Sequence, residues 1–414
     1  MSEPVGVVRN AVALSVVQVA NYAFPLLTFP YLTRTLSTEI FGMVAVVTAV
    51  SAYFMMVSDY GFGLTATRDV AAARSDPQRV AVLMSAVFGA KLVLLAASVL
   101  ILALGLLLTR ASSIVVGLHV LAFLGVVGYA LTPTWYFHGM EQMAWVTYPT
   151  VVAKGLLAAA TFWWVRGDAD VIRLLSLQAL SALVVAAFGL LAMRRHVVIS
   201  APWPTISSIR RCMADATSVF VSRVLVTLYS SSGVLVLGLV SDLSAVGAYA
   251  IAEKASSALS SIYGPILQAL FPSLARDYHD RPEVFHSRFR RSTRLLLLSS
   301  VFLAVAVAVA APLISRAIRG APDPEVAALL RVLALAIAVA PAGPSFTNYL
   351  VIVGRQRAVT HAVFAAAVVN LLLVVPLVVV YQASGLAWTV VLVQFFVAAA
   401  VRYRARTRVK GLPV

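Results

Sequence analysis

The stretch Pro25-Leu-Leu-Thr-Phe-Pro-Tyr-Leu-Thr-Arg34 is followed by a short polar turn, an apolar run from Ile40 to Phe62 and a charged stretch that ends at Arg74. The apolar run is long enough to cross a bilayer as a helix, which takes ~20 residues. It carries Asp59 near its far end, and a charge at membrane depth is costly unless it has a partner or water. We therefore expect a membrane span here, with a functional charge close to one surface.

The composition of the whole chain points the same way. Of its 414 residues, 61% are hydrophobic and 12% are charged, and the mean hydropathy is +0.94. These values exclude a set of soluble domains and predict a polytopic membrane protein. The first apolar run, about residues 11–32, is longer than a signal-peptide core and has no small-residue cleavage site after it, so we expect a retained helix. The single cysteine, Cys212, excludes an internal disulfide and a cysteine-based metal cluster.

Apolar runs of spanning length predict an all-α protein with about twelve transmembrane helices in two lobes of six around a central cavity. The N-terminal lobe is residues 1–200, and the C-terminal lobe, residues 201–414, ends in a basic cytoplasmic tail; an Ala-Pro-Trp-Pro stretch from Ala201 looks like the linker. The expected helices cover about 11–33, 40–64, 80–108, 112–137, 145–165, 172–193, 214–240, 246–271, 294–316, 326–353, 358–381 and 384–401.

The net charge of +16 is explained by membrane orientation rather than by nucleic acid binding. With both termini in the cytoplasm, the inside segments carry 21 lysines and arginines and the outside segments carry 6, as the positive-inside rule requires. The inside segment Arg281–Arg294 mixes arginines with phenylalanines, which fits either a solvated loop or an interfacial helix on anionic lipids.

Cations within the predicted spans are the main functional candidates, because charge at that depth is expensive. Four of them lie near mid-depth: Lys91, Lys154, Arg223 and Lys254. Arg223 shares a helix face with Thr227 and Ser230, a polar stripe that suits a wet cavity. The structural alternative for Arg223 is a bond to a helix carbonyl or to a carboxylate, and for Lys91 and Lys154 it is pairing between helices.

Prolines within the predicted spans are candidates for hinges. Pro25 and Pro30 interrupt the first helix, and Pro341 and Pro344 interrupt the tenth. Proline removes a backbone hydrogen bond, and irregular backbone at membrane depth is tolerated beside cavities or packed protein. These prolines are also compatible with ordinary kinks. Arg34 follows the first helix and is expected at the outer surface, at the mouth of the cavity.

The segment Trp135-Tyr-Phe-His-Gly-Met-Glu141 ends the fourth predicted helix at the inside surface, and its aromatic residues are expected to form part of an interfacial belt. No HExxH, Walker A, GxSxG or dinucleotide fingerprint occurs, and no segment outside the membrane is long enough to form a catalytic domain. We therefore expect a transporter without a bound cofactor, not an enzyme.

Taken together, the following stretches resemble the Wzx-type flippases of polysaccharide repeat units: Pro25–Arg34, Phe41-Gly42, Asp59-Tyr-Gly-Phe62 with Thr67-Arg68, Trp135–Glu141, Val246-Gly-Ala-Tyr-Ala-Ile-Ala-Glu253-Lys254 and Leu270-Phe-Pro-Ser-Leu-Ala-Arg276. These flippases belong to the multidrug/oligosaccharidyl-lipid/polysaccharide exporter superfamily. The resemblance implies a central cationic cavity, export of undecaprenyl-diphosphate-linked oligosaccharides across the bacterial cytoplasmic membrane, and work alongside a polymerase and glycosyltransferases.

A lipid-linked diphosphate carries roughly two negative charges, and Lys91, Lys154, Arg223 and Lys254 would supply its countercharge in the membrane, with Arg34 at the cavity mouth. Asp59 and Glu253 are candidates for coupling to a proton or sodium gradient, and the membrane potential is a further driving force. For Asp59, which lies close to Arg68 in sequence, we expect an interfacial ion pair with that arginine in preference to a coupling role.

Three other functions remain open at this point. A cation-coupled multidrug antiporter of the same superfamily would favour buried carboxylates over buried cations, and the first helix contains no acid. A polytopic polymerase, ligase or glycosyltransferase acting on the same lipid would need a larger outside loop or an acidic catalytic cluster. A membrane scaffold without transport would not need cations at mid-depth.

Overall fold

A computed structural model describes residues 23–196 and 203–406. In these ranges the chain is helical without strands, which confirms the all-α prediction. A helix over residues 23–35 comes first. It is followed by α2 (Thr38–Asp59), α3 (Phe62–Ala72), α4 (Pro77–Leu108), α5 (Ser113–Leu131), α6 (Thr134–Gly139), α7 (Ala144–Trp164), η1 (Asp168–Asp170), α8 (Val171–His196), α9 (Ile206–Val240), α10 (Leu243–Ser260), α11 (Tyr263–Asp280), α12 (Pro282–Arg319), α13 (Pro324–Val339), α14 (Ala342–Ile352) and α15 (Gln356–Arg406).

Among the described residues, eight helices or joined helices are long and apolar enough to cross a membrane, and a bent pair within α9 makes a ninth. Five of these spans join two labelled helices: α2 with α3, α5 with α6, η1 with α8, α10 with α11, and α13 with α14. Helix α15 is divided at Gln382, whose φ of 47° and ψ of −126° are not helical. The predicted boundary between helices 358–381 and 384–401 falls at this kink. With α7 and both parts of α15, about twelve membrane helices fit the structure.

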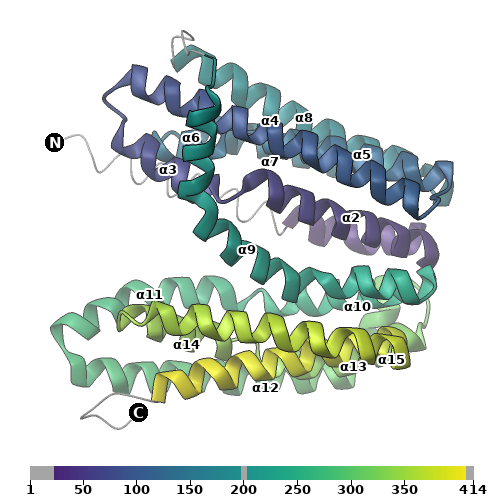
Figure 1. Cartoon of the computed structure of the whole chain (residues 1–414). Coiled ribbons are helices and arrows are strands. Elements are labelled where there is room, and N and C mark those ends of the chain that lie inside the picture. Colours follow the sequence, from purple (N-terminus) through teal and green to yellow (C-terminus); the bar gives the residue numbers. More distant parts are fainter. Residues whose placement is uncertain (1–22, 197–202, 407–414) are drawn as a thin grey trace. The chain divides into compact units, whose positions relative to one another are not determined.

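The described residues group into two compact units (Figure 1). Unit 1 contains the described residues up to and including Leu36 and those of Val47–Thr227, and unit 2 contains Ser37–Val46 and the described residues from Leu228 onward. The start of α2 thus packs with unit 2, and the start of α9 packs with unit 1. The division into lobes at residue 200 stays a prediction.

In unit 1, α6 packs on α3. The hydroxyl of Thr67 donates a hydrogen bond of 3.1 Å to the Trp135 carbonyl, and Nη2 of Arg74 donates one of 2.8 Å to the Gly139 carbonyl. Trp135 and its two aromatic neighbours are at most 1% exposed and form part of the hydrophobic core. The prediction of an interfacial aromatic belt at Trp135-Tyr-Phe is therefore wrong, because α6 turns these rings toward α3 instead of toward lipid.

In unit 2, the first turns of α2 and α10 cross at two glycines. A Cβ on Gly42 would overlap the carbonyl oxygen of Leu243, and a Cβ on Gly247 would overlap the carbonyl oxygen of Thr38. Both positions therefore need glycine for the two backbones to approach this closely. Two stretches that carry the family resemblance, Phe41-Gly42 and Val246-Gly247, form one packing contact.

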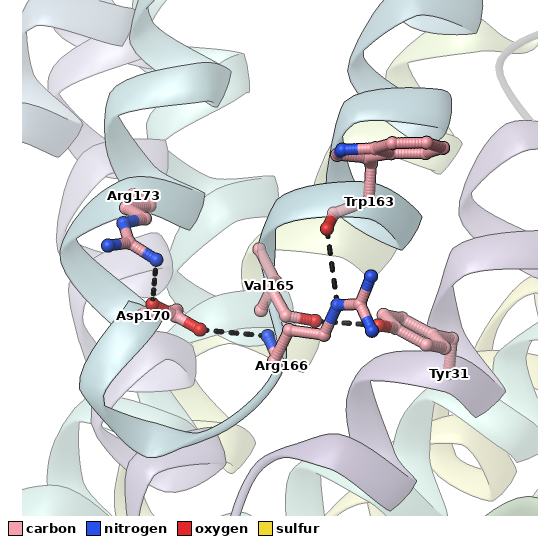
Figure 2. A network of polar contacts seen from close by, with 6 residues as sticks. All are labelled: Tyr31, Trp163, Val165, Arg166, Asp170 and Arg173. Carbon is pink, nitrogen blue, oxygen red and sulfur yellow. Dashed lines mark hydrogen bonds and ion pairs between the residues drawn. The ribbon is translucent and has the colours of Figure 1, made fainter.

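The turn between α7 and α8 anchors the helix over residues 23–35 within unit 1 (Figure 2). The Tyr31 hydroxyl donates to the Val165 carbonyl at 2.6 Å. Asp170 accepts a hydrogen bond from the Arg166 backbone at 2.9 Å and pairs with Arg173, which fixes the turn itself. Tyr31 follows Pro30 directly, so the helix is held immediately after its proline.

Candidate functional site

Asp59 lies at the break between α2 and α3. Tyr60 and Gly61 have positive φ values of 46° and 90°, and this left-handed conformation interrupts the helix within the span Thr38–Ala72 without reversing the chain. A Cβ on Gly61 would lie 2.8 Å from Cβ of Val219, and the Tyr60 ring stacks on Phe220 with a centroid distance of 4.2 Å. Helix α9 therefore packs directly on the turn and brings its next residues to Asp59.

Arg223 of α9 forms an ion pair with Asp59, with Nη1 at 3.4 Å from Oδ2. The side chain of Asp59 is 11% exposed and that of Arg223 is 43% exposed. Oδ2 is buried without a hydrogen-bond partner, so the contact is an ion pair at longer range than a charge-assisted hydrogen bond. The predicted pairing of Asp59 with Arg68 is wrong, because Arg68 turns to Asp69 at 2.8 Å.

Lys91 is 3% exposed in the core of unit 1. Its ammonium donates a hydrogen bond of 2.8 Å to the carbonyl of Ala130, near the C-terminus of α5, where the helix dipole favours a cation. Asp59 also attracts this ammonium electrostatically. Of these two predicted cations, Arg223 forms the direct ion pair with Asp59, whereas Lys91 is bonded to the Ala130 carbonyl. Lys91 makes the interhelical contact that the sequence left open as its structural role.

Lys154 lines a cavity of about 570 Å³ within unit 1, a size typical of ligand-binding sites. The cavity lies among α2, α5, α7 and α8. Lys154 is ten residues from either end of α7, which places it ~15 Å along the helix. The polar residues that line the cavity are Thr48, Ser51, Tyr129, Thr132, Thr134, His138, Thr147, Thr150, Lys154, Gln178 and Ser181. These polar groups lie in a lining that is otherwise apolar, and the hydroxyls of Ser51, Thr132 and Thr150 also donate to carbonyls of their own helices.

An apolar groove of about 530 Å³ lies next to this cavity, between α7 and α8. Leu157 and Ser181 line both spaces, so they form the border between them. The far wall of the groove includes Trp163 and Trp164, which are 72% and 54% exposed. Unit 1 therefore places a largely apolar cavity that contains Lys154 and several hydroxyl groups beside a groove that is almost entirely apolar.

The lining of the cavity has a sequence signal that a search for charges overlooks. Thr147, Thr150 and Lys154 follow each other at offsets of three and four residues, so they share one face of α7. Gln178 and Ser181 repeat this spacing on α8. Tyr129 and His138 also line the cavity, and neither was among the predicted site residues.

In unit 2, Lys254 lies over the ring of Phe41, with Nζ 5.7 Å from the centroid. Such a cation–π contact contributes about 0.5–2 kcal/mol. Lys254 is exposed, whereas the neighbouring Glu253 is half-buried on the same helix. The pair lies nearly two turns after the crossing at Gly247.

The other predicted residues lie at helix ends or breaks. Pro25 and Pro30 are within the helix over residues 23–35, and Arg34 is exposed at its end. Pro341 is buried at the break between α13 and α14, and Pro344 is exposed in the first turn of α14. Their roles in gating stay predictions. No group of three His, Cys, Asp or Glu side chains suited to a metal occurs in the part of the chain described.

Two curated proteins resemble this chain over nearly its whole length. A "Putative O-antigen transporter" of Escherichia coli (strain K12) is 28% identical over 395 residues, which is 94% of each chain. A protein of the same description from Shigella dysenteriae is 25% identical and covers 95% of this chain and 100% of its own length.

Solved structures of transporters share the fold. An inward-facing multidrug resistance MATE family transporter of the MOP superfamily has a TM-score of 0.74 at 13% identity, covering 97% of this chain and 98% of its own. The lipid II flippase MurJ, in an inward closed conformation, has a TM-score of 0.72 at 10% identity and covers 97% and 88%. At sequence identities of 13% and 10%, these two comparisons show similarity of fold alone.

A family model described as "Polysaccharide biosynthesis protein" matches residues 7–277, more than half of the chain. It spans all of unit 1 that the structure describes and the crossing of α2 with α10. The chain belongs to this family of polysaccharide biosynthesis proteins, which confirms the resemblance to the Wzx-type flippases.

Proposed function

We propose that this protein flips undecaprenyl-diphosphate-linked oligosaccharide repeat units from the cytoplasmic to the outer leaflet of the bacterial cytoplasmic membrane. The observation that carries this proposal is the cavity lined by Lys154, halfway along α7, next to an apolar groove in the same unit. The family membership and the two O-antigen relatives support a lipid-linked sugar as the substrate.

The two spaces match the two ends of such a substrate. Hydroxyl and amide side chains hydrogen-bond sugar hydroxyls, and the Lys154 ammonium offsets the charge of the diphosphate. The polyprenyl chain would lie in the apolar groove, where Leu156 and Trp163 offer apolar surface. An amphiphile could thus keep its head inside the protein while its tail stays in the lipid.

Movement of the lipid diphosphate outward is favoured by the membrane potential. With a negative cytoplasm, two negative charges gain about 4–5 kcal/mol per 100 mV. Alternating access between the two lobes would then need no ATP. We also propose that Asp59 or Glu253 couples transport to a proton or sodium gradient. Both termini would lie in the cytoplasm, and the protein would work together with a polymerase and glycosyltransferases.

Reconstitution of the full chain tests the proposal. Proteoliposomes loaded with undecaprenyl-diphosphate oligosaccharide should expose it on the opposite leaflet, measured by labelling of its sugar from outside. Lys154→Gln should slow this exposure about tenfold or more, and Lys154→Arg should retain most of it because the charge remains. Arg110→Gln is the matched control, since Arg110 is an exposed cation of unit 1 that does not line the cavity.

A wild-type protein that exposes no lipid-linked sugar would refute the proposal. Proton-dependent export of a cationic dye in the same vesicles would instead favour a multidrug antiporter, the function of one of the structural neighbours. Equal rates in Lys154→Gln and Arg110→Gln would leave the flippase function standing and remove Lys154 from its site.

A further inference from the structure

Helix α12 extends well beyond the membrane. Its 38 residues span ~57 Å, almost twice the ~30 Å hydrocarbon core. Residues 295–315 carry no charged side chain and have the length of a complete span, whereas the preceding turns are basic. The basic segment Arg281–Arg294, for which the sequence allowed either a solvated loop or an interfacial helix, is therefore helical from Pro282 onward. Arg294 marks the boundary between this segment and the apolar span.

Two pairs of arginines face a common groove at this boundary. Arg290 and Arg294 are one turn apart on α12, and Arg402 and Arg406 are one turn apart on α15. Residues four apart share a helix face, so each pair presents its guanidinium groups to the same side. Arg402 follows an uncharged stretch of α15, as Arg294 precedes one on α12. Both helices thus bring their arginines to the edge of the apolar region.

The groove between these arginines has a volume of about 440 Å³ and an apolar side. Phe289 and Phe346 form its inner wall, with ring centroids 5.7 Å apart. Leu298 and Val301 continue the groove along α12 and are 61% and 49% exposed. From Arg294 to Val301 the helix rises ~10 Å. The groove therefore passes from a cationic end to an apolar end along one helix face.

The cationic end contains four arginines, and no acidic side chain is among the described residues that line the groove. Asp277, which does not line the groove, pairs with Arg288 at 2.8 Å. Like charges brought together in this way repel one another, and an anion among them removes that cost. Planar guanidinium groups also bind phosphate through two parallel hydrogen bonds.

We propose that the groove of Arg290, Arg294, Arg402 and Arg406 is a binding site for an anionic phospholipid of the surrounding membrane. The phosphate of the headgroup lies among the arginines, and one acyl chain lies along Leu297, Leu298 and Val301. Basic pockets between membrane helices that bind lipid headgroups have this arrangement of charge. The site is separate from the cavity of unit 1 and does not depend on the proposed substrate.

Lipid binding to the purified full-length protein tests this site. Native mass spectrometry in detergent would follow titration with dioleoylphosphatidylglycerol and with dioleoylphosphatidylcholine, which has the same chains and no net charge. The wild type should bind the anionic lipid about tenfold more tightly. Arg294→Gln with Arg402→Gln should abolish this preference, and Arg294→Lys with Arg402→Lys should keep most of it.

The double variant Arg291→Gln with Arg404→Gln is the matched control. It removes the same charge from the same two helices, and neither residue lines the groove. Its affinity should stay within about twofold of the wild type, and unchanged thermal unfolding would establish that each variant is folded. Equal losses in both glutamine variants would show general surface attraction and overturn the proposal.

Competition with two further ligands shows whether the groove binds a membrane phospholipid, free phosphate or the transported lipid. Inorganic phosphate at millimolar concentration should not displace the phospholipid, because it lacks the acyl chain. Undecaprenyl phosphate should compete less well than phosphatidylglycerol. Displacement by undecaprenyl phosphate at a lower concentration than phosphatidylglycerol would assign the groove to the transported lipid instead, and no preference for phosphatidylglycerol over phosphatidylcholine would refute the site.

Discussion

The guanidinium of Arg223 lies 3.4 Å from the carboxylate of Asp59, across the turn that joins α2 and α3. The two partners differ in environment, because the Asp59 side chain is 11% exposed and the Arg223 side chain is 43% exposed. Loss of the arginine would leave a buried carboxylate with less compensation, whereas loss of the aspartate would leave an arginine that already reaches outward. The ion pair is thus energetically asymmetric.

We therefore expect Arg223→Gln to destabilise the protein more than Asp59→Asn. The cost of the arginine variant should be roughly 1–3 kcal/mol, the usual penalty when a buried polar group loses its partner. Thermal unfolding of the purified variants in detergent measures the difference. The double variant should recover part of the loss, and additive effects of the two substitutions would show that the pair has no coupling energy.

The same pair also makes a prediction for transport. If Arg223 serves as a counterion for the substrate, Arg223→Lys should flip lipid-linked oligosaccharide faster than Arg223→Gln, because it keeps the charge. Rates are compared at a temperature where both variants remain folded. Equal rates in the two variants would restrict Arg223 to its structural contact with Asp59.

The helical segments and the class of protein could be predicted from sequence, since span length and apolar runs are local properties. The partner of Arg223 could not be predicted in this way. It depends on the backbone conformation at Tyr60-Gly61 and on the packing of α9, and the periodicity of apolar residues carries no information about either. Trp135 shows the same limit, because aromatic composition fits a membrane interface and a buried core equally well. The sequence shows Lys154 within an apolar stretch. The cavity that it lines could not be predicted, because its walls come from α2, α5 and α8, whose positions relative to α7 are known only from the structure.

The crossing of α2 and α10 makes a stability prediction. Gly42→Ala and Gly247→Ala each place a methyl group where the other backbone lies, so each should cost about 1–3 kcal/mol. Gly117→Ala is the control, because a Cβ there meets nothing within 4 Å and alanine is the better helix former. The midpoint temperature of thermal unfolding should fall in the Gly42→Ala and Gly247→Ala variants and should stay the same or rise in Gly117→Ala. A neutral Gly42→Ala variant would contradict the tight crossing.

Glu141 predicts a pH dependence at the junction of α3 and α6. A hydrogen bond from Arg74 and the charge of that guanidinium lower the pKa of Glu141, and the two groups are 2.9 Å apart. Because the folded pKa lies below the value of about 4.3 in an unfolded chain, the stabilisation is present above that pH. It is lost as the pH falls through the folded pKa.

The comparison with Glu141→Gln isolates this effect. The wild type should unfold at a slightly higher temperature than the variant at pH 7, by an amount that is small because Glu141 is on the surface. The gap should close as the pH is lowered below about 4. A constant gap between the two proteins across this range would mean that Glu141 stabilises the fold by some contact other than its charge.

Replacement of Pro30, one of the two prolines in the helix over residues 23–35, tests the hinge hypothesis. Pro30 has no N–H to donate to the carbonyl of Leu26, and Tyr31 beside it is held by the Val165 carbonyl. Pro30→Ala allows that backbone hydrogen bond to form and should straighten and stabilise the helix. If bending at this point is part of transport, the flipping rate should fall severalfold while the thermal stability holds or rises.

Pro312→Ala is a suitable control, because Pro312 lies inside α12, outside the predicted hinges, and its replacement also permits a missing backbone hydrogen bond. Its stability should change in the same direction, but its flipping rate should stay near that of the wild type. The rates of both variants are measured with the same loaded vesicles. A Pro30→Ala protein that transports at the wild-type rate would refute the hinge, since a hinge that acts in each cycle cannot be stiffened without slowing transport.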